Sequence, residues 1–168
     1  MNVSKTYIRV PVYKNRADVQ LTLDNDFNVP DSKPDMERII QEKGMLHIRD
    51  IKPGKDKCVI RGELAFGILY MGDDGSSQLQ SIEGSIPFEE TVNMDGLQDT
   101  DHMDIRWDME DLRTGMINSR KTSVRSIILL RVTALRMGEE EAAMAVEDSE
   151  DLWAQNKTCH LSRKYVSQ

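Results

Sequence analysis

The stretch that decides the fold is Lys57–Met71, KCVIRGELAFGILYM, in which apolar residues recur at every second position. Successive side chains of a strand point to opposite faces of a sheet, so this period predicts a long strand with one buried face. The side chains of that face are Cys58, Ile60, Leu64, Phe66, Ile68 and Tyr70. Gly62 and Gly67 fall within the pattern and predict a bulge or a bend.

The segments on either side of this strand predict antiparallel neighbours for it. On the N-terminal side, Met45–Ile51 is extended, and Lys52–Lys55 (KPGK) has the composition of a turn. On the C-terminal side, the turn GDDGSS at Gly72–Ser77 precedes the extended run Gln78–Met94. Turns between extended runs are typical of β-hairpins, so three consecutive strands are expected.

Further stretches also have the character of strands, and these are Thr6–Val12, Asp18–Leu23, His102–Leu112 and Lys121–Met137. The first two could pair as a hairpin. Lys121–Met137 is the most apolar, so we expect it at the centre of a sheet. Pro11 and Pro87 mark candidate edge strands, because proline cannot donate to a ladder of hydrogen bonds. The predicted fold class is mostly β, as an antiparallel β-sandwich or a partly open barrel.

One short helix is expected in the N-terminal third, at Pro34–Lys43. Asp31 or Ser32 could cap its free N–H groups, and a proline suits its first turn. Gly44 could end the helix in a left-handed conformation. The apolar residues of the segment have helical spacing, and they are Met36, Ile39 and Ile40.

The composition changes after Gly138, where the sequence becomes EEEAAMAVEDSED. Residues 1–138 are therefore expected to form the β domain. Residues 139–168 are expected to form an acidic helix or linker and a tail, which could open a further domain.

Charge and composition limit the classes of function that the sequence can support. The net charge of −7 and the isoelectric point near 5.0 argue against a dedicated nucleic-acid binder, which needs a basic face. No apolar run is long enough to span a bilayer, and the N-terminus has no secretory pattern, so a cytoplasmic location is expected. Cys58 and Cys159 are expected to be reduced thiols, with Cys58 in the core.

No constellation of catalytic residues is evident. The only His and Cys neighbours are Cys159 and His160, so no metal or cofactor is expected. No glycine-rich phosphate loop or nucleophile elbow occurs, and the expected protein is not an enzyme. A hydrolase would need Asp99, Asp101 and Asp104 to converge in a cleft, with at least one raised pKa.

A ligand-binding module is the main alternative. Small ligands and glycans stack on aromatic side chains, and the candidates are Tyr70, Trp107, Trp153 and Tyr165. Trp107 lies on the apolar face of its predicted strand, which favours packing in the core. The alternative requires several aromatic side chains on one open concave face.

Residues 18–135 resemble the SPOCS domain of spore-coat and spore-envelope proteins of endospore-forming Firmicutes, including the SipL-like morphogenetic proteins. The resemblance is carried by the order and spacing of Val29-Pro30-Asp31, Pro34-Asp35, Gly62-Glu63-Leu64, Ile68-Leu69-Tyr70 and Ile86-Pro87-Phe88. These residues are also explained by helix initiation and strand packing.

The resemblance implies a scaffold role in the mother cell, through contact with a spore-coat morphogenetic protein, the basement-layer ATPase, on the mother-cell side of the forespore envelope. Family members carry a C-terminal LysM module that recognises glycan, and this sequence has no such segment. A glycan role is therefore not transferred, and neither are individual binding residues. Pairing of two copies through an exposed strand edge is a further expectation.

Overall fold

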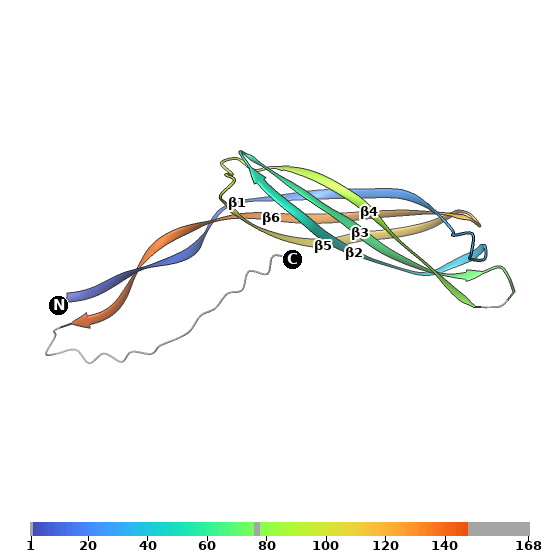
Figure 1. The fold of residues 1–168 in the computed structure, drawn as a ribbon, viewed down its shortest axis with the longest axis horizontal. Helices are drawn as coiled ribbons and strands as arrows, with labels where there is room; N and C mark the ends of the chain where they lie inside the picture. The colour runs from blue at the N-terminus through green and yellow to red at the C-terminus, as the bar shows by residue number, and fades with distance from the viewer. Residues whose placement is uncertain (1, 76–77, 148–168) are drawn as a thin grey trace.

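The computed structural model describes residues 2–75 and 78–147, and these residues form six β-strands (Figure 1). The strands are β1 (Asn2–Asn28), β2 (Met36–Gly54), β3 (Lys57–Gly72), β4 (Leu79–Asn93), β5 (His102–Asn118) and β6 (Lys121–Glu147). No helix in the described ranges could span a membrane.

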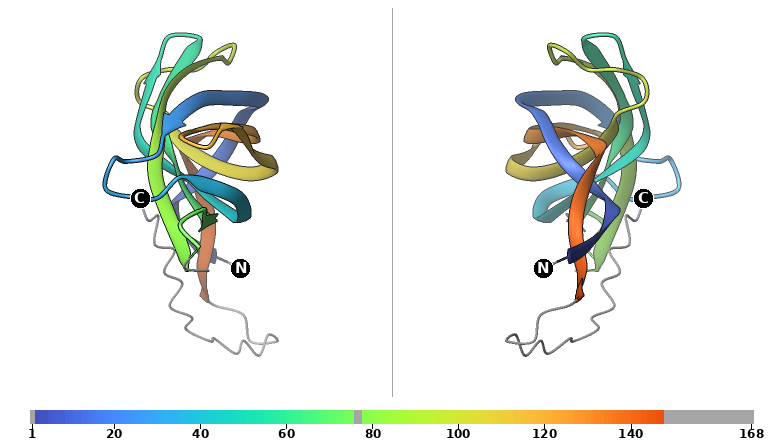
Figure 2. Two further views of the ribbon diagram at one scale, coloured as in Figure 1. Left: turned by 90° about the vertical axis from the view of Figure 1, so that its right-hand side faces the viewer. Right: turned by 90° about the vertical axis from the view of Figure 1, so that its left-hand side faces the viewer.

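Two antiparallel sheets of three strands each make up the fold, with the orders β1-β6-β5 and β2-β3-β4. The two end-on views show these sheets as separate layers that face each other (Figure 2). The prediction of a mostly-β protein with two antiparallel sheets is confirmed. The strand formed by Lys121–Met137 lies at the centre of its sheet, as expected, and Pro11 and Pro87 lie in the edge strands β1 and β4.

The core lies between the two central strands. Every second side chain of β3 is buried from Cys58 onward, and the pattern fits the sequence prediction. β6 contributes the fully buried side chains Val124, Ile128, Leu130, Val132 and Ala134. Cys58 is a buried free thiol, as expected, and its burial raises the pKa of the thiol. Cys159 lies outside the described residues.

The predicted helix at Pro34–Lys43 is wrong, because β2 begins at Met36 and pairs with β3. Register breaks at Met36/Arg38 and Ile39/Gln41 explain the error. Each break inserts an extra residue in β2, so the inward-facing Met36 and Ile39 are three positions apart and imitate helical spacing. Ile40 is exposed.

The predicted hairpin of Thr6–Val12 with Asp18–Leu23 is also wrong, because both segments belong to the single strand β1 of 27 residues. A bulge interrupts the two-residue period between the two segments. The register shifts between Tyr13 and Asn15, and both halves of β1 pair with β6. At the β2–β3 connection the predicted turn is displaced, since β2 continues to Gly54 and the left-handed residue is Asp56, with φ 58°.

The acidic stretch after Gly138 is extended as far as Glu147, where a helix or a linker was expected. It forms part of β6 because the first residues of β1 pair with it. Two cross-strand ion pairs accompany this pairing, Lys5–Glu141 at 2.9 Å and Arg9–Glu139 at 3.8 Å. Residues 148–168, which contain the rest of the expected acidic segment and tail, lie outside the described residues.

Candidate interaction groove

The three aspartates considered for catalysis do not converge. Asp99 borders a hollow beside the β2–β3 turn, Asp101 borders a second hollow near Lys14, and Asp104 lies on β5 in a groove described below. No group of three His, Cys, Asp or Glu side chains in the described ranges could hold a metal ion.

Asp101 anchors the loop between β4 and β5. Its carboxylate accepts hydrogen bonds from the Lys14 ammonium at 2.6 Å and from the Gln98 N–H at 2.8 Å, and only 4% of the side chain is exposed. Burial by itself raises the pKa of Asp101, but Lys14, the Gln98 N–H and Arg136 together lower it. A lowered pKa is the opposite of what a general acid requires, so the geometry gives Asp101 a structural role.

The aromatic side chains also lie apart. Tyr70 is fully buried and donates a hydrogen bond from its hydroxyl to the Pro34 carbonyl at 3.0 Å. Trp107 was expected to pack in the core, but it lies at the surface with 39% of its area exposed. Trp153 and Tyr165 lie outside the described residues.

Trp107 lines a groove between the edge strands β2 and β5, which run side by side along one open side of the sandwich (Figure 1). The groove has a volume of about 820 Å³. Its lining residues come from both sheets and are Leu46, His47, Ile48, Arg49, Ile51, Glu63, Met103, Asp104, Ile105 and Trp107.

The groove combines apolar side chains with a charged rim. Several lining side chains, among them Ile48, Met103 and Ile105, pack against the buried core and so form an apolar floor. The rim carries an Arg49–Glu63 ion pair. The lining of the groove is therefore mixed, with an apolar floor beside a polar and charged rim.

A glycine allows β2 and β3 to approach closely beneath this groove. A Cβ atom at Gly62 would lie 2.3 Å from the His47 carbonyl oxygen and 2.9 Å from the Phe88 ring. The β2–β3 register breaks at the same level, between Ile48 and Asp50. The bulge expected at Gly62 is therefore in the neighbouring strand, and it displaces Arg49 toward the rim.

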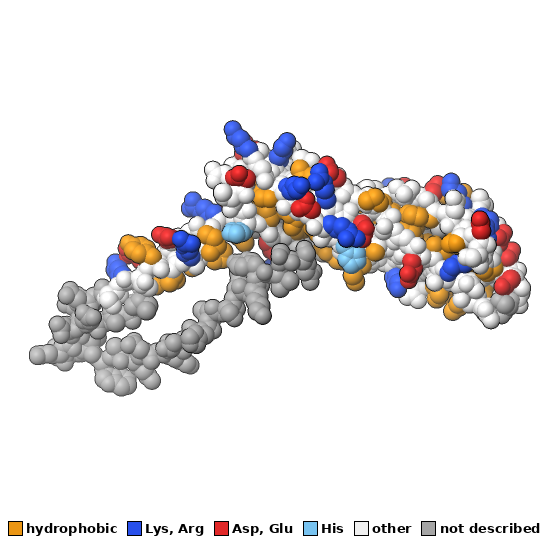
Figure 3. Space-filling view, viewed as in Figure 1, with side chains coloured by type: hydrophobic (Ala, Val, Ile, Leu, Met, Phe, Trp, Pro, Cys, Tyr) orange, Lys and Arg blue, Asp and Glu red, His pale blue; other side chains and the backbone are white. Residues whose placement is uncertain are grey.

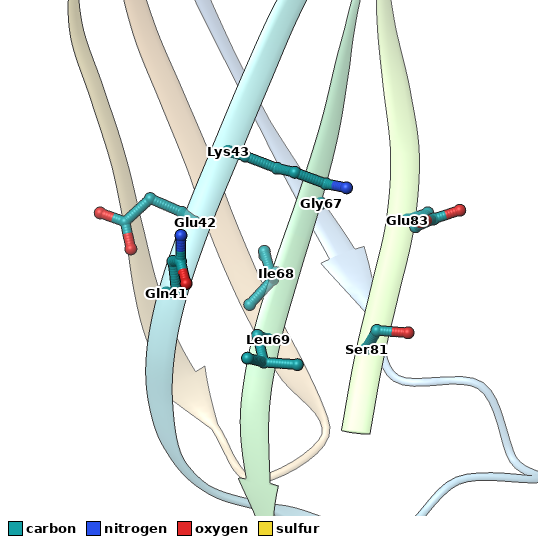
Figure 4. Close-up of a pocket in the computed structure, with 8 residues that line it drawn as sticks. All are labelled: Gln41, Glu42, Lys43, Gly67, Ile68, Leu69, Ser81 and Glu83. Atoms are coloured by element: carbon teal, nitrogen blue, oxygen red, sulfur yellow. The ribbon is translucent and has the colours of Figure 1, made fainter. Parts of the chain in front are cut away.

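Another hollow, separate from the groove and from the two hollows near Asp99 and Asp101, has a volume of about 300 Å³ and lies on the sheet β2-β3-β4 (Figure 4). The Lys43 side chain crosses β3 above Gly67 toward β4, where Ser81 and Glu83 are placed. The space exists because Gly67 has no side chain. It lies over the central strand β3, which pairs with β2 on one side and with β4 on the other.

The residues of the motif Val29–Asp35 have a role that sequence reasoning missed. They form a loop that crosses from β1 to β2, here called the crossover loop, and it wraps around Arg120 in the β5–β6 turn. The Arg120 guanidinium donates to the carbonyls of Val29 at 3.1 Å and Lys33 at 2.8 Å, and to the Asp35 carboxylate at 2.9 Å.

The same loop is fixed through its backbone. The N–H groups of Val29 and Met36 donate to the carbonyls of Arg120 and Ser119, both at 2.8 Å. The pKa of Asp35 is lowered by the hydrogen bonds from Arg120 and Ser119. The aspartate expected to start a helix therefore joins the two sheets, and the only sequence signal was an arginine beside a serine in a turn.

The family comparison agrees with this geometry. Residues 35–117 match the family described as SipL, SPOCS domain. The matched stretch is about half of the 168 residues and includes β2, β3, β4 and nearly all of β5, so it contains every residue of the groove. No curated protein and no solved structure matches the chain significantly. The strands that build the groove form a SPOCS domain, and the chain belongs to the SPOCS-domain family.

Proposed function

We propose that this protein is a non-catalytic interaction module of spore-envelope assembly, which holds a partner protein in the groove between β2 and β5. The supporting observation is the groove itself, which lies within the SPOCS domain and combines an apolar floor with two unpaired strand edges. The family supports a role related to sporulation. The scaffold role is our inference from the surface.

The proposed mode of binding is addition of an extended segment of the partner to a sheet edge. Edge strands present free N–H and C=O groups, which supply main-chain hydrogen bonds to an added strand. Alternate side chains of that strand would then face the floor formed by Ile48, Met103 and Ile105. Trp107 would cover the partner chain from the β5 side, because it is the large partly exposed ring of the lining.

Charge complementarity favours a basic segment. The protein has a net charge of −7, so its field attracts cations and repels acidic chains. The proposed partner is the spore-coat morphogenetic protein of the basement layer, an ATPase, and the proposed location is the mother-cell side of the forespore envelope. Both follow from the family resemblance.

Titration of the purified protein with the purified basement-layer ATPase tests the proposal. Trp107→Ala should weaken binding at least tenfold, because partly buried aromatic anchors dominate interface energies. Ile117→Ala is the matched control, since Ile117 is on the same strand and is 51% exposed but does not line the groove. Equal effects of the two substitutions would place the contact elsewhere.

Sedimentation with purified peptidoglycan should run in parallel. The proposal predicts that the protein stays in the supernatant. Sedimentation with peptidoglycan and no binding to the ATPase would overturn the proposal and favour the ligand-binding alternative.

A further inference from the structure

The strands β1 and β6 extend beyond the sandwich as a two-stranded ribbon, here defined as residues 2–12 and 136–147 (Figures 1 and 2). β5 accompanies β6 only as far as Leu135, which pairs with His102. Beyond that point, β6 has β1 on one side and no strand of the described chain on the other. The unpaired edge is Arg136–Glu147.

The side chains described in this ribbon form no core. Not one side chain in the ranges 4–12 and 136–143 is buried. Hydrophobic side chains alternate with charged ones along its surface (Figure 3), and Tyr7, Ile8 and Met137 are among the exposed ones. An isolated two-stranded ribbon is marginally stable in water, and a third or fourth strand is what normally stabilises it.

The two edges of the ribbon are not equivalent. The β1 edge contains Pro11, which has no N–H to donate, and the cations Lys5 and Arg9, so it resists strand addition. The β6 edge contains no proline. Two of its glutamates, Glu139 and Glu141, are already paired with the cations of β1.

We infer that a second copy of this chain adds to the unpaired β6 edge, so that two ribbons join as a four-stranded sheet with the order β1-β6-β6-β1. A two-fold axis makes the β6 strands antiparallel and places the two sandwiches at opposite ends of the joined sheet. Each sandwich then lies away from the other copy's sandwich, since the ribbon projects from one end of it (Figure 1).

The sequence of the edge is complementary to itself in this arrangement. A two-fold axis perpendicular to the sheet keeps every side chain on its own face, so directly opposed positions of the two copies must differ by an even number. When Ala142 lies opposite Ala142 of the copy, Glu141 falls opposite Ala143. The next permitted registers toward the sandwich place Glu141, Glu140 or Glu139 directly opposite the same residue of the copy, which is destabilising. The three central positions, 141–143, also precede the register break that follows Ala143 in β6, so regular pairing is available there.

Substitution of Ala143 tests this dimer, because the ribbon and the dimer respond in opposite directions. Within one chain Ala143 lies opposite Lys5, so Ala143→Glu should stabilise the ribbon and Ala143→Lys should destabilise it. In the dimer the residue lies opposite Glu141 of the second copy. Ala143→Glu should therefore weaken dimerisation and Ala143→Lys should strengthen it, each by roughly two- to thirtyfold from two symmetric contacts.

Sedimentation equilibrium of the full chain measures the dissociation constant of each variant. Ser85→Glu and Ser85→Lys are the controls, since they make the same charge changes on the exposed face of β4 and should leave the constant unchanged. Trp107→Ala should also leave it unchanged, which separates the dimer from the groove. A monomer at all concentrations, the reverse order of the two Ala143 variants, or an equal effect of the Ser85 variants would overturn the inference.

Discussion

Replacement of Arg120 by methionine should destabilise the fold by separating the crossover loop from the β5–β6 turn. Methionine keeps an unbranched apolar stem and removes the guanidinium. The variant therefore loses the hydrogen bonds to the partly buried carbonyls of Val29 and Lys33 as well as the ion pair with Asp35.

The expected loss of stability follows from the two hydrogen bonds that Arg120 donates to the carbonyls of Val29 and Lys33. A hydrogen bond with one charged partner contributes roughly 1.5–3 kcal/mol, so two contribute about 3 kcal/mol at the lower end of that range. Because 36% of the Arg120 side chain is exposed, water can replace part of this interaction. We expect a loss of about 2 kcal/mol, which corresponds to a decrease of about 4–8 °C in Tm for a chain of this size.

Urea unfolding at pH 7 measures the free energy, with Arg113→Met as the matched control. Arg113 also forms an aspartate ion pair, with Asp111 at 2.8 Å, but its side chain is 79% exposed, so its removal should change little. Arg120→Lys should recover little of the loss, because an ammonium cannot donate to three separate acceptors in the geometry of the guanidinium. Equal stability of Arg120→Met and Arg113→Met, or full recovery by lysine, would refute the reasoning.

The pH dependence provides a second test of the same contact. The pKa of Asp35 is lowered in the folded state, so its contribution to stability is present above the unfolded value and is lost as pH falls through the folded value. Arg120 is the largest cause of that shift. The stability difference between the natural chain and Arg120→Met should therefore become smaller as the pH is lowered below the ordinary pKa of 3.8.

Three further changes test other contacts. Lys14→Met leaves Asp101 buried without its cation, and it should cost roughly 2 kcal/mol at pH 7 in urea unfolding; the deficit should shrink as falling pH protonates the carboxyl. Gly62→Ala should destabilise the fold by roughly 1–3 kcal/mol, because the new methyl group collides with the His47 carbonyl, and thermal unfolding measures the loss. Tyr70→Phe removes one hydrogen bond to the crossover loop and should cost about 1 kcal/mol, measured by urea unfolding.

Strands with regular pairing were predictable from the sequence, and strands with bulges were predicted poorly. β3 and β4 pair without a register shift, and their two-residue period is visible in the sequence. β2 contains three shifts, and its first two place Met36 and Ile39 at helical spacing. In β1 a single shift at Tyr13/Asn15 divides one strand into two apparent segments. A bulge inserts one residue and so reverses which positions of the strand face the core. The two-residue period of the sequence is interrupted there, and prediction from that period fails.

The candidate groove was less predictable than the fold, because it depends on which edge strands of the two sheets lie side by side, and strand periodicity does not contain that information. Trp107 has the alternation of a core residue, and only the position of β5 at the end of its sheet exposes it. Asp35 and Arg120 are 85 positions apart, and no local pattern connects them. The family motif was recognisable in the sequence, but its physical role required knowledge of the tertiary contact.

The distribution of bulges also indicates which edges can accept another strand. An unpaired edge invites association, and folded proteins protect such edges with bulges, prolines and charges. β2 has a bulge at Arg49 within the groove, and the edge strands β1 and β4 contain Pro11 and Pro87. In contrast, β5 pairs regularly with β6 and contains no proline from His102 to Met109, the part that includes its groove residues, and residues 136–143 of β6 are also regular and free of proline. We therefore expect a partner segment in the groove to pair with β5 rather than β2, and the proposed dimer uses a different regular edge, that of β6.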